Sequence, residues 1–297
     1  MMRRILIIAL AGILVTSGMA LAVPYGKSSQ KNAPPDQIRG MHFGGVYPQV
    51  DTMWPGVTTV HPWVDNKTYP SPENVTEWAY GACANCLFFT PYYGPLYGAL
   101  GANNTNIAPA DSYLDDLANT LEGRGMSIVI MVLPTGNYYP MFGNTVENVA
   151  SHLGQLSLGH PNLIVEFDEP DWGGGTPISE TTFTQWVSSV KSANPDCFVT
   201  VGLDYYRGTP AIDKKWWSHC DGVTLIDYWA YSASSLRTRV TTWVNAVDPK
   251  PCWTFIPTGD VGNQVGGVNL NAQQTKDYLD VAITYSSGSF VFDRGGM

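Results

Sequence analysis

Four acidic residues lie close together at the end of one apolar segment, in the stretch Glu166-Phe167-Asp168-Glu169-Pro170-Asp171-Trp172. Carboxyl groups act as general acids and bases, and neighbouring carboxyl groups raise each other's proton affinity. A site lined by Trp disfavours the ionised form further, so we expect Glu169 to keep its proton and act as a general acid, assisted by Asp168. The alternative is that these acids only bind backbone amides or an Arg side chain at the rim of the fold.

Polar and aromatic residues also follow the other apolar segments of the chain. Aromatic rings stack on the C–H faces of sugar rings, and carboxylates accept hydrogen bonds from sugar hydroxyls. We therefore expect a carbohydrate-binding surface. For Glu166, a structural role inside the fold is an equal alternative. The candidate catalytic residues are Glu169, Asp168, Asp227 and Tyr228, and the candidate substrate-binding residues are His42, Tyr92, Glu166, Trp172, Asp204, Tyr205, Trp229, Asp293 and Arg294.

Short apolar segments alternate along the chain with segments of helical periodicity, which are the elements that must position these residues. Ser179, Ser234 and Asn271 are good N-cap residues for three of the helices. The predicted strands are 39–44, 86–90, 127–133, 163–168, 197–204, 222–228, 252–256 and 289–293, and the clearest predicted helices are 111–124, 145–156, 179–192, 234–247 and 271–285.

Regular alternation of strand and helix predicts parallel strands joined by right-handed crossovers. Eight such units favour a single-domain (β/α)₈ TIM barrel over residues 38–297, with its active site at the C-terminal ends of the strands. An open doubly wound sheet is the alternative, but the Gly-rich phosphate loop expected after its first strand is absent. The sequence ends just after the last predicted strand, so we expect the barrel to lack its last helix.

The stretch from Glu166 to Trp172 resembles the fourth-strand signature of glycoside hydrolase barrels, in which an Asn-Glu-Pro sequence carries the general acid/base. Asp168 stands here in place of that Asn. The Asp168-Glu169 pair also resembles hexosaminidase-type barrels, in which the Glu is the acid and the Asp orients the acetamido group of the substrate as nucleophile. The resemblance implies a TIM barrel that cleaves glycosidic bonds, and the exact family stays open.

The chain departs from the Asn-Glu-Pro enzymes at strand seven, where they carry a nucleophilic Glu and residues 254–260 here contain none. A retaining mechanism with two Glu residues is therefore not expected. Asp227-Tyr228 resembles the strand-six Asp and Tyr of chitinase-type barrels. Two mechanisms remain: a substrate-assisted one, in which Asp168 and Tyr228 position an N-acetyl group, and an inverting one, in which a second carboxylate activates water. The candidates for that base are Asp204, Asp227 and Asp293.

The N-terminus has the pattern of a secretory signal over residues 1–22, with two Arg, a short apolar run and a small-x-small cleavage site. An N-terminal membrane anchor is the alternative. Residues 23–37 read as a flexible lead-in. We expect a secreted, extracellular protein without stable membrane insertion once the signal is removed. Disulfides are then permitted, and the five Cys predict one or two structural disulfides and a buried thiol.

The overall composition narrows the class of partner. A 44% hydrophobic content excludes wholesale disorder, and a net charge of −9 argues against nucleic acid as a partner. The His residues lack metal-site spacing, so neither a metal nor a cofactor is expected. A secreted, non-catalytic carbohydrate-binding or cell-surface protein on the same barrel is the alternative to a glycoside hydrolase. The sequence leaves the oligomeric state open.

Overall fold

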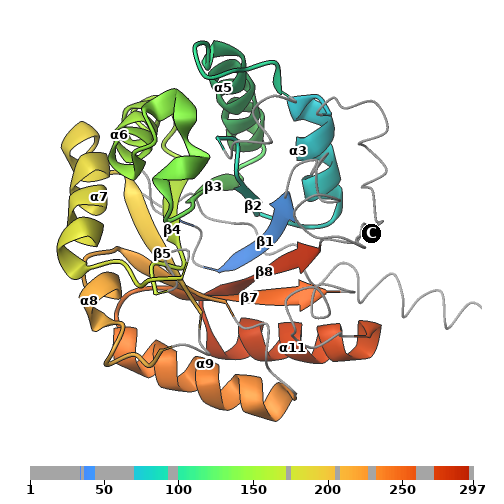
Figure 1. Ribbon diagram of the computed structural model, residues 1–297. Helices are drawn as coiled ribbons and strands as arrows, with labels where there is room; N and C mark the ends of the chain where they lie inside the picture. Colours follow the sequence, from blue (N-terminus) through green and yellow to red (C-terminus); the bar gives the residue numbers. More distant parts are fainter. Residues whose placement is uncertain are drawn as a thin grey trace, which may run out of the picture.

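The protein forms a closed barrel of eight parallel strands in sequence order in a computed structural model (Figure 1). The structure describes residues 34, 37–43, 70–92, 100–171, 175–204, 208–226, 232–258 and 271–293. The strands are β1 (Ile38–Phe43), β2 (Cys86–Phe89), β3 (Ser127–Val132), β4 (Leu163–Asp168), β5 (Phe198–Asp204), β6 (Gly222–Ile226), β7 (Cys252–Thr258) and β8 (Gly288–Asp293). The predicted (β/α)₈ fold is confirmed, because β8 pairs with β1 and closes the sheet.

Helices connect successive strands and surround the barrel (Figure 1). They are α3 (Pro72–Gly81), α5 (Ala108–Gly123), α6 (Val146–Leu156), α7 (Glu180–Ala193), α8 (Lys214–Trp217), α9 (Ala233–Val247) and α11 (Ala272–Tyr285), with two short 3₁₀ turns, η2 (Gly136–Tyr138) and η3 (Pro140–Phe142), after β3. Among the described residues, which end at Asp293, no helix follows β8. None of the described helices is long and apolar enough to cross a membrane.

The helix starts follow local capping chemistry. The Ser179 side chain accepts a hydrogen bond from the backbone of Thr182, and Asn271 forms a capping box with Gln274, as N-cap residues do. The third predicted cap is displaced by two residues. Ser232, rather than Ser234, caps α9 and accepts from the backbone of Ser235 at 3.1 Å.

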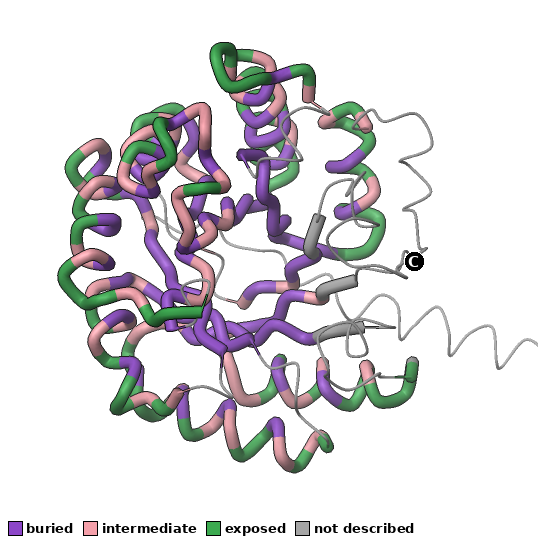
Figure 2. The backbone as a smooth tube through the Cα atoms, in the orientation of Figure 1, coloured by how far each residue is buried: buried purple, intermediate pink, exposed green. Residues whose placement is uncertain are grey.

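Two apolar layers hold the barrel together, and they arise because successive side chains of a strand point to opposite faces. Figure 2 shows the strands buried almost throughout, whereas each helix exposes one side. The inner layer combines aliphatic residues with several aromatic rings, and Phe88 packs edge-to-face on Phe255 and Phe290 at 5.3 and 5.1 Å between ring centres. The outer layer packs strand residues such as Val165 and Phe167 against the helices.

The contact between α6 and α7 depends on a glycine. A methyl group added at Gly154 would lie 2.6 Å from the Val190 carbonyl oxygen and 2.9 Å from the Ala193 Cβ. We expect Gly154→Ala to lower the free energy of unfolding by about 1–3 kcal/mol, because overpacking outweighs the better helix propensity of Ala. Urea denaturation measures this. Gly123→Ala, which meets nothing within 4 Å, is the matched control, and equal stability of the two variants would contradict the prediction.

The expectation of one or two disulfides is wrong. All five cysteines are free: Cys83 is exposed, and Cys86, Cys197, Cys220 and Cys252 are buried. The buried thiols lie in or beside different strands of the barrel and fill space there as small apolar groups. Burial raises the pKa of the Cys197 thiol to about 11, so this thiol stays protonated and unreactive. Residues 1–22, the predicted signal, lie outside the described part of the chain.

Candidate functional site

The C-terminal end of β4 holds Glu169 in an unusual backbone conformation. Glu169 has φ of 39°, in the left-handed region that residues other than glycine rarely adopt. Its N–H donates a hydrogen bond of 2.9 Å to the carbonyl oxygen of Gly202, on the neighbouring strand β5. Pro170 follows, and its carbonyl oxygen accepts from the backbone of Ile178 at 2.8 Å. The chain therefore turns sharply after β4 and presents a part-buried Glu169 at the rim of the barrel.

Asp168 and Glu166 lie beside the same glycine of β5. A methyl group at Gly202 would come within 3.0 Å of Glu166 Oε1 and 3.2 Å of Asp168 Oδ1. A side chain at this position would force these neighbours to shift, so glycine leaves the most room for both carboxyl groups. Asp168 pairs in register with Gly202, and Glu166 pairs with Thr200 one layer below. A third carboxyl group therefore lies inside the barrel, below the candidate general acid and its neighbour.

Glu166 has no exposed surface. Its Oε2 accepts a hydrogen bond from Thr224 Oγ1 on β6, while its Oε1 is buried and has no hydrogen-bond partner among the described residues. Burial raises the pKa of Glu166 to about 8, against the opposing effect of the Thr224 hydrogen bond. Glu166 is therefore mainly protonated at pH 7, and it lies inside the barrel below Asp168 on β4.

Further carboxyl groups surround Glu169 on the side of β5. Asp204, the last residue of β5, is buried, and so are Asp171 and Asp213. The pKa of Asp171 rises to about 7, first through burial and then through the charges of Glu169, Asp204 and Asp213. The pKa of Asp213 rises to about 6 through burial and through Asp204, although Lys215 lowers it. At neutral pH these groups cannot all be ionised without mutual repulsion.

Tyr92 is tied into the wall of the barrel. Its hydroxyl donates to Asp111 Oδ1 at 2.5 Å and lies 3.3 Å from His152 Nε2, which is itself 2.9 Å from the same Asp111 oxygen. Its ring packs edge-to-face on Phe142. Tyr92 is only 2% exposed. Its contacts link the segment after β2 to α5 and α6, which is a structural role.

The remaining sequence-predicted residues fall partly or wholly outside the described part. The backbones of His42 and Asp293 belong to β1 and β8, and His42 pairs in register with Phe88. Their side chains are outside the description. Six other candidates lie wholly outside the described residues: Trp172, Tyr205, Asp227, Tyr228, Trp229 and Arg294. Of the candidates, the structure therefore gathers Asp168, Glu169 and Asp204 around the ends of β4 and β5, with Glu166 below.

Sequence reasoning missed four residues of this region. Asp171 was part of the acidic stretch but carried no signal that it would be buried. Gly202 and Thr224 look like ordinary strand residues, and their roles depend on register with β4. Asp213 lies just before α8, too short a helix to be predicted from periodicity. Trp216 on α8 is buried, and its Nε1 donates to the Ile178 carbonyl oxygen at 3.0 Å.

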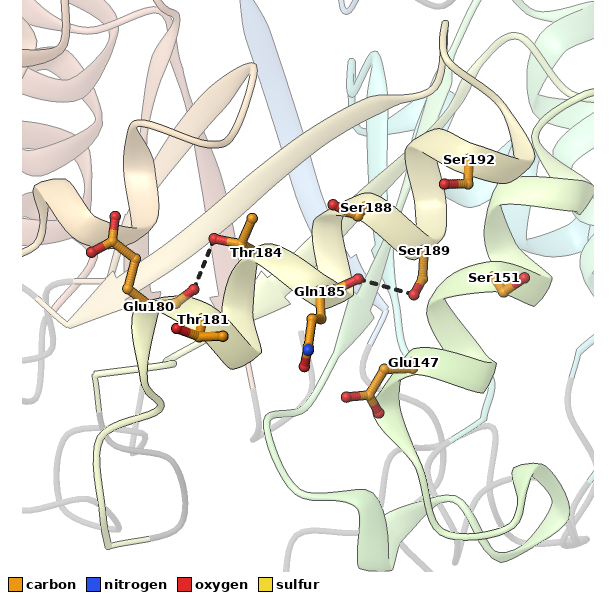
Figure 3. A pocket seen from close by; sticks show the side chains of 9 residues that line it. All are labelled: Glu147, Ser151, Glu180, Thr181, Thr184, Gln185, Ser188, Ser189 and Ser192. Atoms are coloured by element: carbon orange, nitrogen blue, oxygen red, sulfur yellow. Dashed lines mark hydrogen bonds between the residues drawn. The ribbon is translucent and has the colours of Figure 1, made fainter.

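Within the described ranges, no group of three His, Cys, Asp or Glu side chains is arranged to hold a metal ion. An open groove of about 870 Å³ lies on the outside, between α6 and α7 (Figure 3). Hydroxyl groups line most of it, and those of Thr184 and Ser189 donate to carbonyl oxygens of their own helix. None of the sequence-predicted site residues lines this groove, which lies on the outer surface of α6 and α7.

Comparisons with known proteins support the fold. No family model and no curated protein matches the sequence. The catalytic domain of endoglucanase Cel5A of Thermobifida fusca, solved in complex with cellotetraose, is similar in structure, with a TM-score of 0.57, 14% identity, and coverage of 88% of this chain and 80% of that one. Cellulase Cel5C_n gives a TM-score of 0.58 at 13% identity, over 91% of this chain and 80% of that one. At such identity the likeness shows the barrel fold alone.

Proposed function

We propose that this protein is a secreted glycoside hydrolase that cleaves a glycosidic bond in a polysaccharide or glycoconjugate. The observation that carries the proposal is the backbone conformation of Glu169. This residue is held in a left-handed conformation at the end of β4, where its N–H is bound to β5. Backbone strain of this kind concentrates at functional sites, and the C-terminal ends of the strands are where (β/α)₈ enzymes act.

Glu169 donates its proton to the leaving glycosidic oxygen as the C–O bond breaks, and a water oxygen finally bonds to the anomeric carbon. This role requires Glu169 to carry its proton when the substrate binds. Asp168 assists from the preceding position, either by orienting an acetamido group of the substrate or beside a separate base. Asp204 is the described candidate for that base, and Asp227 with Tyr228 completes the proposed catalytic set.

A carbohydrate substrate is further supported by the chain's composition, which combines aromatic residues with carboxylates after the strands. The proposed substrate-binding set keeps His42, Trp172, Asp204, Tyr205, Trp229, Asp293 and Arg294. Tyr92 and Glu166 are both buried, so in this proposal they support the binding surface and do not contact the substrate themselves.

The experiment begins with the whole chain expressed with residues 1–22, so that export and activity are tested together. We expect the medium to contain protein that begins at Val23 by mass spectrometry, and this protein to release reducing ends from at least one of a panel of N-acetylated and plain polysaccharides. Intact chain retained in the membrane fraction would contradict secretion. Binding to a polysaccharide without cleavage would contradict the enzyme and favour a carbohydrate-binding protein.

A further inference from the structure

Three Asn-x-Thr triplets lie outside the proposed catalytic set. Asn, any residue except Pro, and then Ser or Thr is the acceptor sequence for N-linked glycans in secreted proteins. The sequence does not rank the three, because a usable acceptor also needs an exposed Asn side chain and an exposed hydroxyl. The structure describes the second and third, and Asn66 lies outside the described residues. The triplets are Asn66-Lys67-Thr68, Asn74-Val75-Thr76 and Asn103-Asn104-Thr105.

The triplet at Asn103 forms a tight, exposed turn between β2 and α5. Asn103 and Asn106 make an isolated antiparallel bridge, in which the Asn103 N–H donates to the Asn106 carbonyl oxygen at 2.9 Å and the Asn106 N–H donates back at 3.1 Å. Asn103 and Thr105 are both exposed. These contacts span no more than three positions along the chain, so the turn can form locally, before the barrel does.

The side chain of Asn103 is arranged as an acceptor amide. Its Oδ1 accepts hydrogen bonds from the Thr105 hydroxyl at 2.8 Å and from the backbone N–H groups of Thr105 and Asn106 at 2.9 and 3.0 Å. Donors on Oδ1 stabilise the negative charge that the amide gains when Nδ2 gives up a proton. All three contacts use Oδ1, so a glycan attached to Nδ2 leaves the turn intact.

The triplet at Asn74 has a different environment. Asn74 is exposed, but it belongs to the first turn of α3, where its backbone N–H donates to the Ser71 side chain at 3.3 Å. Thr76 is only 2% exposed, and its hydroxyl lies 2.8 Å from that of Thr120 on α5. Folding therefore buries the hydroxyl of this triplet, whereas it leaves the hydroxyl of the Asn103 triplet in solvent.

We propose that Asn103 is an N-glycosylation site of this protein and is modified in preference to Asn74. The donor is an oligosaccharide carried on a polyprenyl diphosphate. Asn103 Nδ2 forms a bond to the anomeric carbon of the first sugar, the bond from that carbon to the diphosphate oxygen breaks, the polyprenyl diphosphate leaves, and Nδ2 loses one proton to the solvent. The inference rests on the secretion that the proposed function includes, since this transfer takes place in the secretory pathway.

Site occupancy after expression in insect cells tests the proposal. One version of the chain keeps residues 1–22, and in a second version a secretion signal of the host replaces them. Protein from the medium and from the secretory membranes is digested with chymotrypsin, which separates the two sites, and treated with peptide N-glycosidase in heavy-oxygen water. This treatment converts each glycosylated Asn into a labelled Asp, which mass spectrometry counts. We expect most molecules to be labelled at Asn103 and several-fold fewer at Asn74.

Variants of the exposed Thr105 show whether its hydroxyl is required. Thr105→Ala should abolish the label at Asn103, whereas the conservative Thr105→Ser should keep it, because Ser supplies the same hydroxyl. Asn74→Gln is the matched control and should leave the label at Asn103 unchanged. Unlabelled Asn103, equal labelling of Asn103 and Asn74, or a label that survives Thr105→Ala would overturn the proposal.

The two versions of the chain separate this inference from the proposed function. Glycan at Asn103 in the version with the host signal, together with failure of residues 1–22 to direct export, would refute the proposed secretion and leave the acceptor assignment standing. Export of both versions without glycan at Asn103 would refute the assignment and leave the secretion standing. Catalysis is judged separately, by cleavage of a polysaccharide.

Discussion

Replacement of Glu169 by Gln is expected to lower the rate of glycan cleavage by about 10²–10⁴-fold, the usual contribution of a general acid. Gln has nearly the same shape and keeps the backbone N–H that binds the Gly202 carbonyl oxygen. It has no proton to give to the leaving oxygen. The loss should therefore appear in kcat far more than in KM, since binding contacts persist.

The matched control is Glu122→Gln, an exposed position on α5, which should retain the wild-type rate. Reducing-end release under saturating substrate measures both variants, and circular dichroism confirms that each is folded. Substrates with a good leaving group sharpen the experiment, because they depend less on protonation and should be cleaved by Glu169→Gln at nearer the wild-type rate. A folded Glu169→Gln protein that cleaves the polysaccharide at the wild-type rate would refute the assignment.

Replacement of Glu166 by Gln is expected to make stability less dependent on pH. The folded-state pKa of Glu166 is raised to about 8 from an ordinary value of 4.5, because the carboxyl group is fully buried. A raised carboxyl pKa stabilises the fold at low pH, and this stability is lost as pH rises from the unfolded pKa through the folded one. Gln mimics the neutral acid, and its side-chain oxygen can still accept the hydrogen bond from Thr224.

At about pH 9 we therefore expect Glu166→Gln to exceed the wild type in free energy of unfolding by on the order of 2–4 kcal/mol, and the two to converge near pH 4. Urea denaturation at several pH values gives the difference. Asp171 also titrates in this range, but it contributes to both proteins and cancels in the comparison. Glu122→Gln again serves as control and should follow the wild type. A difference between Glu166→Gln and wild type that does not change with pH would show that Glu166 is not a buried neutral acid.

The local pattern of the sequence predicts most of the elements. Continuous apolar runs locate all eight strands within a few residues, because a strand covered on both faces has little polar surface. Helical periodicity locates the long helices, such as α7 and α11. The pattern does not locate α8, which at four residues is too short to show a period.

The cysteines show where such reasoning fails. The expectation of export, together with five Cys, favours disulfides on general grounds, yet pairing depends on whether two sulfur atoms meet in space. Cys86 belongs to the inner layer of the barrel, whereas Cys197 and Cys252 belong to the outer layer. These thiols are therefore buried in different layers and are not paired with one another.

By itself, the sequence determined the barrel and the place of its candidate acids, since strand periodicity and the order of elements are local and put Asp168 and Glu169 at the end of β4. Only the tertiary structure decided what each acid near that end can do. Register brings Gly202 and Thr224 against Glu166, and the turn after β4 leaves Asp171 buried among other acids. Proton affinity depends on burial and on neighbouring charges, and those neighbours come from strands and loops that are distant in the sequence.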